Sequence, residues 1–169
     1  MDEKLSSFHC PRWSELPGIP LYLDQLVMVL QDAIGDIFVE NEPVVTKTMI
    51  NNYVKQKLIT PPEQKKYNRS HIMRLIVISL FKRVFSMNEI RLMIDYMIEE
   101  YGTEAAYNLF CSRFEYYLDL IFCSQDSDFA PQQNEHEEEL RLDTAISALV
   151  CKLHLQYFLR ERSPEEPKK

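Results

Sequence analysis

The sequence predicts an all-α fold built around one hydrophobic core. Apolar residues recur at the three- and four-residue spacing of a helix along most of the chain, and no segment alternates long enough to form a sheet core. The 169 residues are 46% hydrophobic and 27% charged, which lies within the range of globular proteins. This length suits one compact domain with helical extensions.

Residues 1–20 are predicted to form an extended arm that lies across the surface. Three prolines restrict the backbone in this segment, and Trp13 is the expected anchor. Residues 21–38 follow with the pattern of an amphipathic helix. Its apolar stripe comprises Tyr22, Leu26, Val29, Leu30, Ala33 and Ile37.

A second, shorter helix is expected to run to about Lys57, with Thr46 or Thr48 as its N-cap. Pro61 prevents this helix from continuing. Residues 63–67 are few and polar, so they can form either a tight turn or a reduced two-stranded wing.

The most apolar helix is expected to begin at Asn68 or Ser70 and to reach Val84. Because it is apolar nearly all round, it should form the buried axis of the fold. Its few polar residues fall in one narrow arc, which predicts an exposed basic strip: His71, Arg74 and Lys82.

Ser86 and Glu89 form a capping box, which predicts a fourth helix that stops at Gly102, placed as a left-handed terminating residue. Thr103 is the expected cap of the next helix, over about residues 104–122. That helix has a markedly aromatic face: Tyr107, Phe110, Phe114, Tyr117 and Ile121. We expect this face to pack within the chain; contact with a second subunit or with a small apolar effector are the alternatives.

A linker at residues 124–133 and a helix over about residues 137–159 are predicted to close the folded part. The apolar side of this helix comprises Leu142, Ile146, Leu149 and Leu153. The predicted organisation is therefore an N-terminal arm (1–20), a central helical module (21–102), a C-terminal helical region (103–160) and a disordered tail (161–169).

Several classes of function are excluded by composition and motifs. The three glycines stand far apart, so neither a P-loop nor a dinucleotide-binding fingerprint is present. No uncharged apolar run approaches the roughly 18 residues of a membrane span, and no apolar secretory core follows the charged start. We therefore expect a cytoplasmic protein with no membrane partner, no catalytic constellation and no cofactor.

The four cysteines include no CxxC pair, which favours free thiols in a reducing compartment. Cys151 and His154 stand three residues apart, a spacing that suits two metal ligands on one helical face. No second pair accompanies them, so a buried thiol beside a surface imidazole is expected instead of a metal site.

The net charge of −7 is unevenly distributed along the chain. Residues 44–95 contain ten basic and three acidic side chains, which gives +7, whereas the remainder contains nine basic and 23 acidic side chains, which gives −14. Such asymmetry is typical of a region that meets a polyanion, although an unevenly charged solvated surface explains it equally well.

Within this basic region, three segments resemble MerR-type regulators. Residues 46–62 resemble the recognition helix and its exit, residues 67–72 resemble the tyrosine after the wing and the following helix start, and residues 85–90 resemble the second capped helix. The resemblance implies a winged helix-turn-helix with a short or vestigial wing. Lys57 stands where a turn glycine is usual, and no cysteine set matches the metal-sensing members.

A second resemblance covers more of the chain. Residues 11–13, 16–17, 21–25 and 49–55 are similar to a bacterial family catalogued only as domain of unknown function 1836, from Pro11 to about Tyr101. This similarity implies a regulator role and no further biochemistry.

The side chains of the predicted recognition helix suit DNA. Asparagine can pair bidentately with an adenine edge, while lysine reaches guanine or phosphate. The predicted base-contacting and capping residues are Thr46, Thr48, Asn51, Asn52 and Lys55, and the predicted phosphate-contacting residues are Lys65, Lys66, Tyr67 and Arg69. His71 and Arg74 of the basic strip are further candidates for DNA contact.

The sequence thus predicts a non-catalytic, sequence-specific regulator of transcription that binds double-stranded DNA. A homodimer is expected, because one short recognition helix reads too few base pairs for useful selectivity. The alternative is a helical protein-interaction module that has kept this fold, has lost DNA binding and docks an acidic partner through its basic face.

Overall fold

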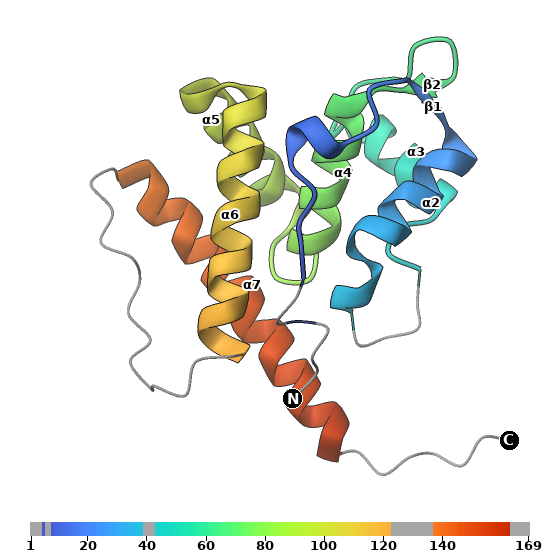
Figure 1. The fold of residues 1–169 in the computed structure, drawn as a ribbon. Helices are drawn as coiled ribbons and strands as arrows, with labels where there is room; N and C mark the ends of the chain where they lie inside the picture. The colour runs from blue at the N-terminus through green and yellow to red at the C-terminus, as the bar shows by residue number, and fades with distance from the viewer. Residues whose placement is uncertain (1–4, 6–7, 39–42, 123–136, 163–169) are drawn as a thin grey trace, which may run out of the picture.

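The computed structural model describes residues 5, 8–38, 43–122 and 137–162, and it is mostly helical, as predicted (Figure 1). Helix α4 stands between α2 and α3 on one side and α5 and α6 on the other (Figure 1). The elements are η1 (Trp13–Glu15), β1 (Leu21–Tyr22), α2 (Leu23–Ile34), η2 (Gly35–Ile37), α3 (Lys47–Lys55), β2 (Lys66–Tyr67), α4 (Arg69–Phe81), α5 (Met87–Tyr101), α6 (Thr103–Phe122) and α7 (Glu137–Arg162).

The first predicted helix begins two residues later than expected, because its start is a strand. Leu21 pairs with Tyr67 and Tyr22 with Lys66 in an antiparallel sheet of β1 and β2. Pairing holds the backbone extended there, so Tyr22 does not join the apolar stripe and is 55% exposed. The prediction for Tyr22 was wrong, whereas Leu26, Leu30 and Ile37 are buried as expected.

The ends of α3 are set by local hydrogen bonds. Thr46 is its N-cap, since the Oγ1 atom accepts a hydrogen bond from the Met49 amide at 3.2 Å. At the other end, Lys57 has a φ of 58°, and the Leu58 amide donates to the Tyr53 carbonyl at 2.9 Å. This left-handed closure, usually made by glycine, stops the helix two residues before the predicted end.

The segment before β2 is the tight turn that was one of two predicted alternatives. Glu63 and Lys66 exchange two backbone hydrogen bonds of 3.0 and 2.8 Å. The two residues between them, Gln64 and Lys65, have φ values of 47° and 64°, as in a type I′ turn. The strand that follows pairs with β1, so the turn is attached to the start of α2.

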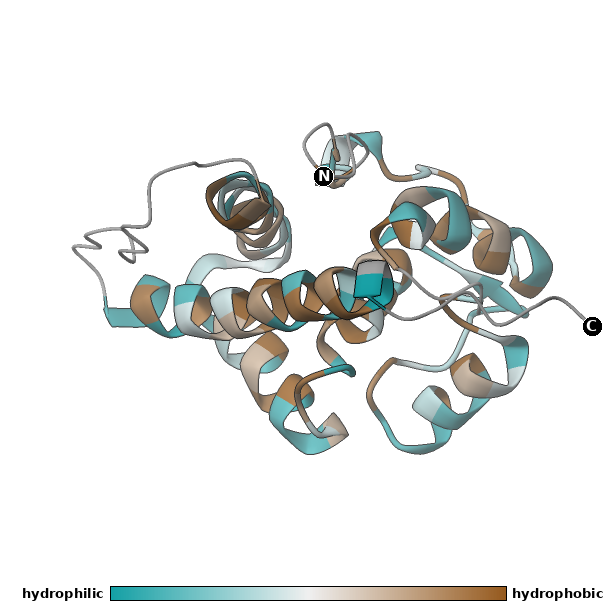
Figure 2. Ribbon diagram, turned by 90° about the horizontal axis from the view of Figure 1, so that it is seen from below, coloured by the Kyte–Doolittle hydropathy of each residue, from teal (hydrophilic) through white to brown (hydrophobic). Residues whose placement is uncertain are grey.

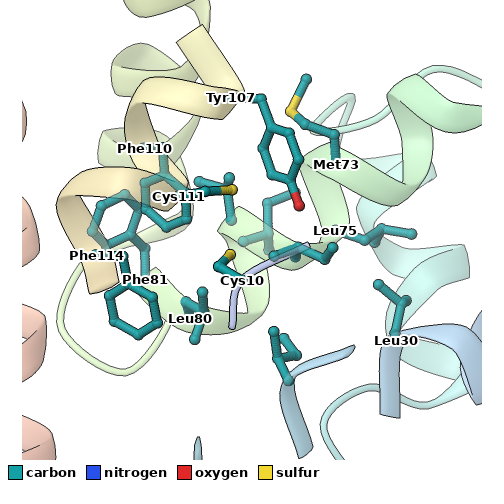
Figure 3. Packing of buried hydrophobic residues seen from close by; sticks show 14 of the residues in the cluster. Cys10, Leu30, Met73, Leu75, Leu80, Phe81, Tyr107, Phe110, Cys111 and Phe114 are labelled. Carbon is teal, nitrogen blue, oxygen red and sulfur yellow. The ribbon is translucent and has the colours of Figure 1, made fainter. Parts of the chain in front are cut away.

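Helix α4 is the buried axis that its composition predicted. Its buried residues are His71, Ile72, Met73, Leu75, Ile76, Val77, Ile78, Ser79, Leu80 and Phe81. Figure 3 shows Leu80 and Phe81 of this helix beside Phe110, Cys111 and Phe114 of α6, with Cys10 of the arm between the helices.

The predicted exposed basic strip on α4 does not exist as such. His71 is only 4% exposed, and Arg74 pairs with Asp95 of α5 at 3.0 Å. Lys82 donates from Nζ to the Val44 carbonyl at 2.8 Å. The helix ends at Phe81, three residues before the predicted Val84, so Lys82 is its C-cap residue, and contacts with neighbouring segments engage all three side chains.

Ser86 caps α5 with Glu89 as predicted, since the Ser86 amide donates to the Glu89 carboxylate at 2.8 Å. Gly102 ends this helix with φ 76° and ψ 161°, which is a positive φ outside the left-handed helical region. Its carbonyl accepts from the Ala106 amide at 3.0 Å, so Gly102 is the residue before α6. Thr103 is therefore the first residue of α6, and its prediction as the cap was wrong.

The aromatic face of α6 is packed within the chain, as expected. Tyr107, Phe110, Phe114 and Tyr117 are all buried, and the Phe110 ring lies 5.5 Å from that of Phe81. An apolar cavity of about 40 Å³ lies beside Tyr107 and Phe110. Ligand pockets have roughly 300–1,000 Å³, a range that this cavity does not reach but that an apolar groove of about 420 Å³ between α5 and α7 does, lined by Leu92, Met93, Tyr96, Met97, Arg141 and Leu142.

Helix α7 completes a single core that runs from Leu5 to Leu153. The four residues of its predicted apolar side are buried, and it ends at Arg162, three residues beyond the expected end. Cys151 is exposed, which corrects the prediction of a buried thiol. The predicted linker at 124–133 and residues 163–169 of the predicted tail lie outside the described residues.

Candidate nucleic-acid interface

Helix α3 presents a polar face to solvent on the side opposite its buried residues Ile50 and Tyr53. The side chains on this face are exposed and form no hydrogen bond or ion pair with other described residues: Thr48, Asn51, Asn52 and Lys55. The structure therefore brings together the four residues that were predicted to reach base edges. Their donors and acceptors are available to a ligand.

Two residues at the start of α3 are used within the protein. The Thr46 hydroxyl is occupied as the N-cap. Lys47 forms an ion pair with Asp24 of α2, which fixes the first turn of α3 against the preceding helix. Thr46 thus positions the face and does not belong to it.

The turn before β2 contributes one free cation. Lys65 lies exposed at the tip, and Figure 1 shows this turn at the same end of the molecule as α3. Lys66 instead places its ammonium group 5.0 Å from the centre of the Tyr22 ring. Tyr67 is 3% exposed, and burial raises the pKa of its hydroxyl, so it is a core residue and not a surface contact.

Arg69, His71 and Arg74 are also engaged within the chain. The Arg69 guanidinium lies 5.5 Å from the centre of the Trp13 ring, which joins α4 to the arm. His71 contacts Thr60 through Nε2 at 3.0 Å and accepts at Nδ1 from the Asn68 amide at 3.1 Å. Burial lowers the pKa of this imidazole, so it is neutral near pH 7.

A polar groove beside the C-terminal end of α3 was missed by sequence reasoning. It has a volume of about 360 Å³ and is lined by Gln56, Lys57, Leu58, Met87, Asn88 and Arg91. The groove joins Lys57 to the first turns of α5, where the helix dipole also favours negative charge. The sequence signals for this groove were the capping box at Ser86 and the basic residues Lys57 and Arg91. These two residues are far apart in the sequence and come together only in the fold.

The positive charge of residues 44–95 is reduced at the surface by contacts within the chain. Seven of the ten basic side chains contact acidic, carbonyl or aromatic groups: Lys47, Lys66, Arg69, Arg74, Lys82, Arg83 and Arg91. Lys55, Lys57 and Lys65 remain exposed without such a partner among the described residues. These three lysines, with Arg91 at the groove, form the cationic rim of the α3 face.

No group of three or more His, Cys, Asp or Glu side chains able to hold a metal ion occurs within the described ranges. In the same part of the chain, no helix combines the length and apolar character needed to cross a membrane.

Comparison with known proteins places the chain in a family. No curated protein and no solved structure matches it. A family model matches residues 11–110, a segment that includes the arm from Pro11, the α3 face, the turn before β2 and the groove beside α5, and that ends within α6. The chain therefore belongs to the family described as domain of unknown function (DUF1836).

Proposed function

We propose that this protein is a cytoplasmic, non-catalytic regulator of transcription that binds double-stranded DNA through a MerR-like winged helix-turn-helix formed by α2 to α5. The observation that supports the proposal most strongly is the α3 face. Asn51 and Asn52 lie beside Lys55 on an exposed helix surface, and none of the three side chains has a partner among the described residues. This combination matches the chemistry of base edges and phosphates.

In the proposed complex, α3 lies in the major groove and the cationic rim contacts the backbone. An asparagine amide forms two hydrogen bonds with adenine, which favours that base by about 1–3 kcal/mol over the others. Lys55, Lys57 and Lys65 each neutralise a phosphate, which raises affinity for every sequence equally. Arg91 and the start of α5 provide a further phosphate site beside Lys57.

The test begins with selection of a binding site from random duplexes. Asn51→Ala should weaken binding to the selected site by about 1–3 kcal/mol and relax the preference at one base pair. Alanine at Lys55, Lys57 and Lys65 together should weaken binding to all duplexes and lower the salt slope by about one unit per lost contact. Lys152→Ala, an exposed lysine on α7, is the matched control and should change neither quantity.

One observation favours the alternative of a protein-interaction module without DNA binding. The connection between α2 and α3 spans residues 35–46, which is longer than the three or four residues of a usual helix-turn-helix turn. The same measurements separate the two functions. Failure to select any sequence, with equal losses on specific and random duplexes for Asn51→Ala, would support the interaction module and contradict the proposal.

A further inference from the structure

We propose that the outward face of α7 binds the same face of a second copy of the chain, as an antiparallel helix pair with its twofold axis at Cys151. The face is a stripe that we call the α7 outer stripe. It comprises Leu140, Thr144, Ala148, Cys151, Leu155 and Phe158.

The orientation of α7 is fixed by contacts on its other side. Ile146, Leu149 and Leu153 are buried in the core, and the Tyr157 hydroxyl donates to the Ile37 carbonyl at 3.3 Å. Arg113 of α6 pairs with Glu139 at 2.5 Å near the start of the helix. The helix is therefore attached at both ends, and its outer stripe cannot rotate into the core.

The outer stripe is unusually apolar for a face directed away from the core. Its residues follow one another at spacings of four and three, so they lie in one line along the helix. Leu140, Leu155 and Phe158 are 45%, 48% and 44% exposed, and Leu159 beside them is 53% exposed. In the view from below, α7 lies across the middle of the molecule (Figure 2).

The charges at the two ends of α7 select a second copy in the opposite direction. The first turn carries Glu137, Glu138 and Glu139, and the last turn carries Arg160 and Arg162. An antiparallel pair places the acidic end of each helix beside the basic end of the other. A parallel pair would place like charges together, which is destabilising.

Two residues of the outer stripe, Thr144 and Phe158, exchange places under a twofold axis at Cys151. Cys151 is eleven residues from both Leu140 and Arg162, and Thr144 and Phe158 are each seven residues from it. Antiparallel pairing about Cys151 therefore faces Thr144 with Phe158 of the other copy and brings the two Cys151 thiols together. Such self-complementarity is required of an interface around a twofold axis.

This interface uses no residue of α3 or of its cationic rim, so the inference is independent of the proposed DNA binding. If both hold, the dimer presents two copies of the α3 face. Dimer formation can be measured without DNA, which keeps the two proposals experimentally distinct.

Sedimentation of the full chain at tens of micromolar should give twice the 20.1 kDa of one chain. Leu155→Glu should give a monomer with unchanged helix content, because each copy would bury an unpaired charge against the helix of the other copy. The matched control is Met28→Glu, which places the same charge on an apolar residue of α2 that is 66% exposed, and it should remain dimeric. A wild-type monomer, or a dimer that survives Leu155→Glu, would overturn the proposal.

Thiol cross-linking tests the axis itself. All variants carry Cys123→Ser, because Cys123 lies outside the described residues, and Cys10 and Cys111 are buried. Mild oxidation should join two chains through Cys151 and should leave Cys151→Ser uncross-linked. Thr144→Cys combined with Cys151→Ser should also fail, since antiparallel copies of position 144 lie about 21 Å apart along the helix. Efficient cross-linking of this last variant would indicate a parallel pair and refute the antiparallel arrangement.

Discussion

The His71 ring connects the loop after α3 to the start of α4 and uses both of its nitrogens. Asn68 donates its amide to Nδ1, which leaves the proton on Nε2 for the Thr60 carbonyl at 3.1 Å. The Tyr67 ring meets the imidazole edge to face at 5.3 Å. Burial favours the neutral ring, in which Nδ1 can accept from the Asn68 backbone amide, while the Asn68 Oδ1 atom lies 2.8 Å from the same nitrogen.

Stability should therefore fall when His71 is protonated. Burial lowers the pKa of His71 in the folded protein below the usual value near 6.5, so the unfolded chain binds the proton first. Its contribution is complete above about pH 6.5 and is lost as the pH falls below that value. We expect the urea midpoint of the wild type to drop between pH 7.5 and 5.5, and that of His71→Gln to change less.

The Glu89 and Glu115 carboxyl groups do not contribute in this range. The pKa values of Glu89 and Glu115 lie below 4.5, so their contributions are lost only at lower pH. Identical pH dependence of the wild type and His71→Gln would show that the ring is not the responsible group.

His71 and Lys57 also show where residue-level prediction stops. A helical arc places His71 correctly on α4 but does not reveal that Thr60 covers it, because that contact depends on the fold. Lys57 adopts a φ of 58° despite its Cβ, at a conformational cost of roughly 1–2 kcal/mol. The place of Lys57 in the sequence predicted the end of the helix, although lysine is not a residue type that usually adopts this backbone conformation.

At the scale of elements, the N-terminal arm is held on α6 by side chains of that helix. The Glu115 carboxylate accepts from the Cys10 amide and from Arg12 Nη1, both at 2.8 Å. The Asn108 Oδ1 atom accepts from the Trp13 amide at 2.8 Å. Burial disfavours the charged carboxylate, but the bonds from Arg12 and Cys10 outweigh it and hold the pKa of Glu115 below its usual value.

Glu115→Ala should loosen the arm. It removes the acceptor of a backbone amide and of a guanidinium, and unsatisfied donors of this kind cost about 1–3 kcal/mol. Trp13 is the single tryptophan of the chain, so its emission reports on the arm alone. We expect a red shift and faster quenching in Glu115→Ala, and no change in the exposed control Glu104→Ala. An unaltered emission spectrum in both variants would mean that other contacts are sufficient to hold the arm on α6.

Elements with local signals were predicted more accurately than those that depend on distant partners. The capping box at Ser86 located the start of α5 because its hydrogen bonds join neighbouring residues. By contrast, β1 was read as helix, since its pairing with β2 joins segments far apart in the sequence. The type I′ turn at Gln64 and Lys65 contains neither the asparagine nor the glycine that is typical of such turns, so its type could not be predicted from the sequence.

For the whole molecule, the shared core predicts unfolding in one step. Ile146 of α7 is completely buried in the cluster that also contains Leu26 and Ile50. Ile146→Ala should lower the free energy of unfolding by about 2–5 kcal/mol. Trp13 emission and far-ultraviolet circular dichroism should report the same shifted urea midpoint, as in a two-state transition.

Lys152→Ala on the solvent side of α7 is the control and should leave both midpoints in place. A Trp13 transition that stays at the wild-type midpoint while the helical signal shifts would reveal two independently unfolding units.

For the molecule as a whole, the sequence predicted which residues share the α3 face, but it did not predict which segments surround that face. Thr48, Asn51, Asn52 and Lys55 share a face because helical spacing alone decides it. The groove at Lys57 and Arg91 depends on how the end of α3 meets α5, and no spacing rule predicts that meeting. The engagement of Arg69 and Arg74 within the chain depends equally on Trp13 and Asp95, which come from other parts of the chain.

The contacts of the arm also determine when it can fold during synthesis. Asn108 follows Trp13 by 95 residues and Glu115 follows Cys10 by 105 residues. At a translation rate of roughly 5 to 20 residues per second, the arm waits roughly 5 to 20 seconds for its partners to be made. The segment around Trp13 therefore leaves the ribosome well before the residues of α6 that hold it in place.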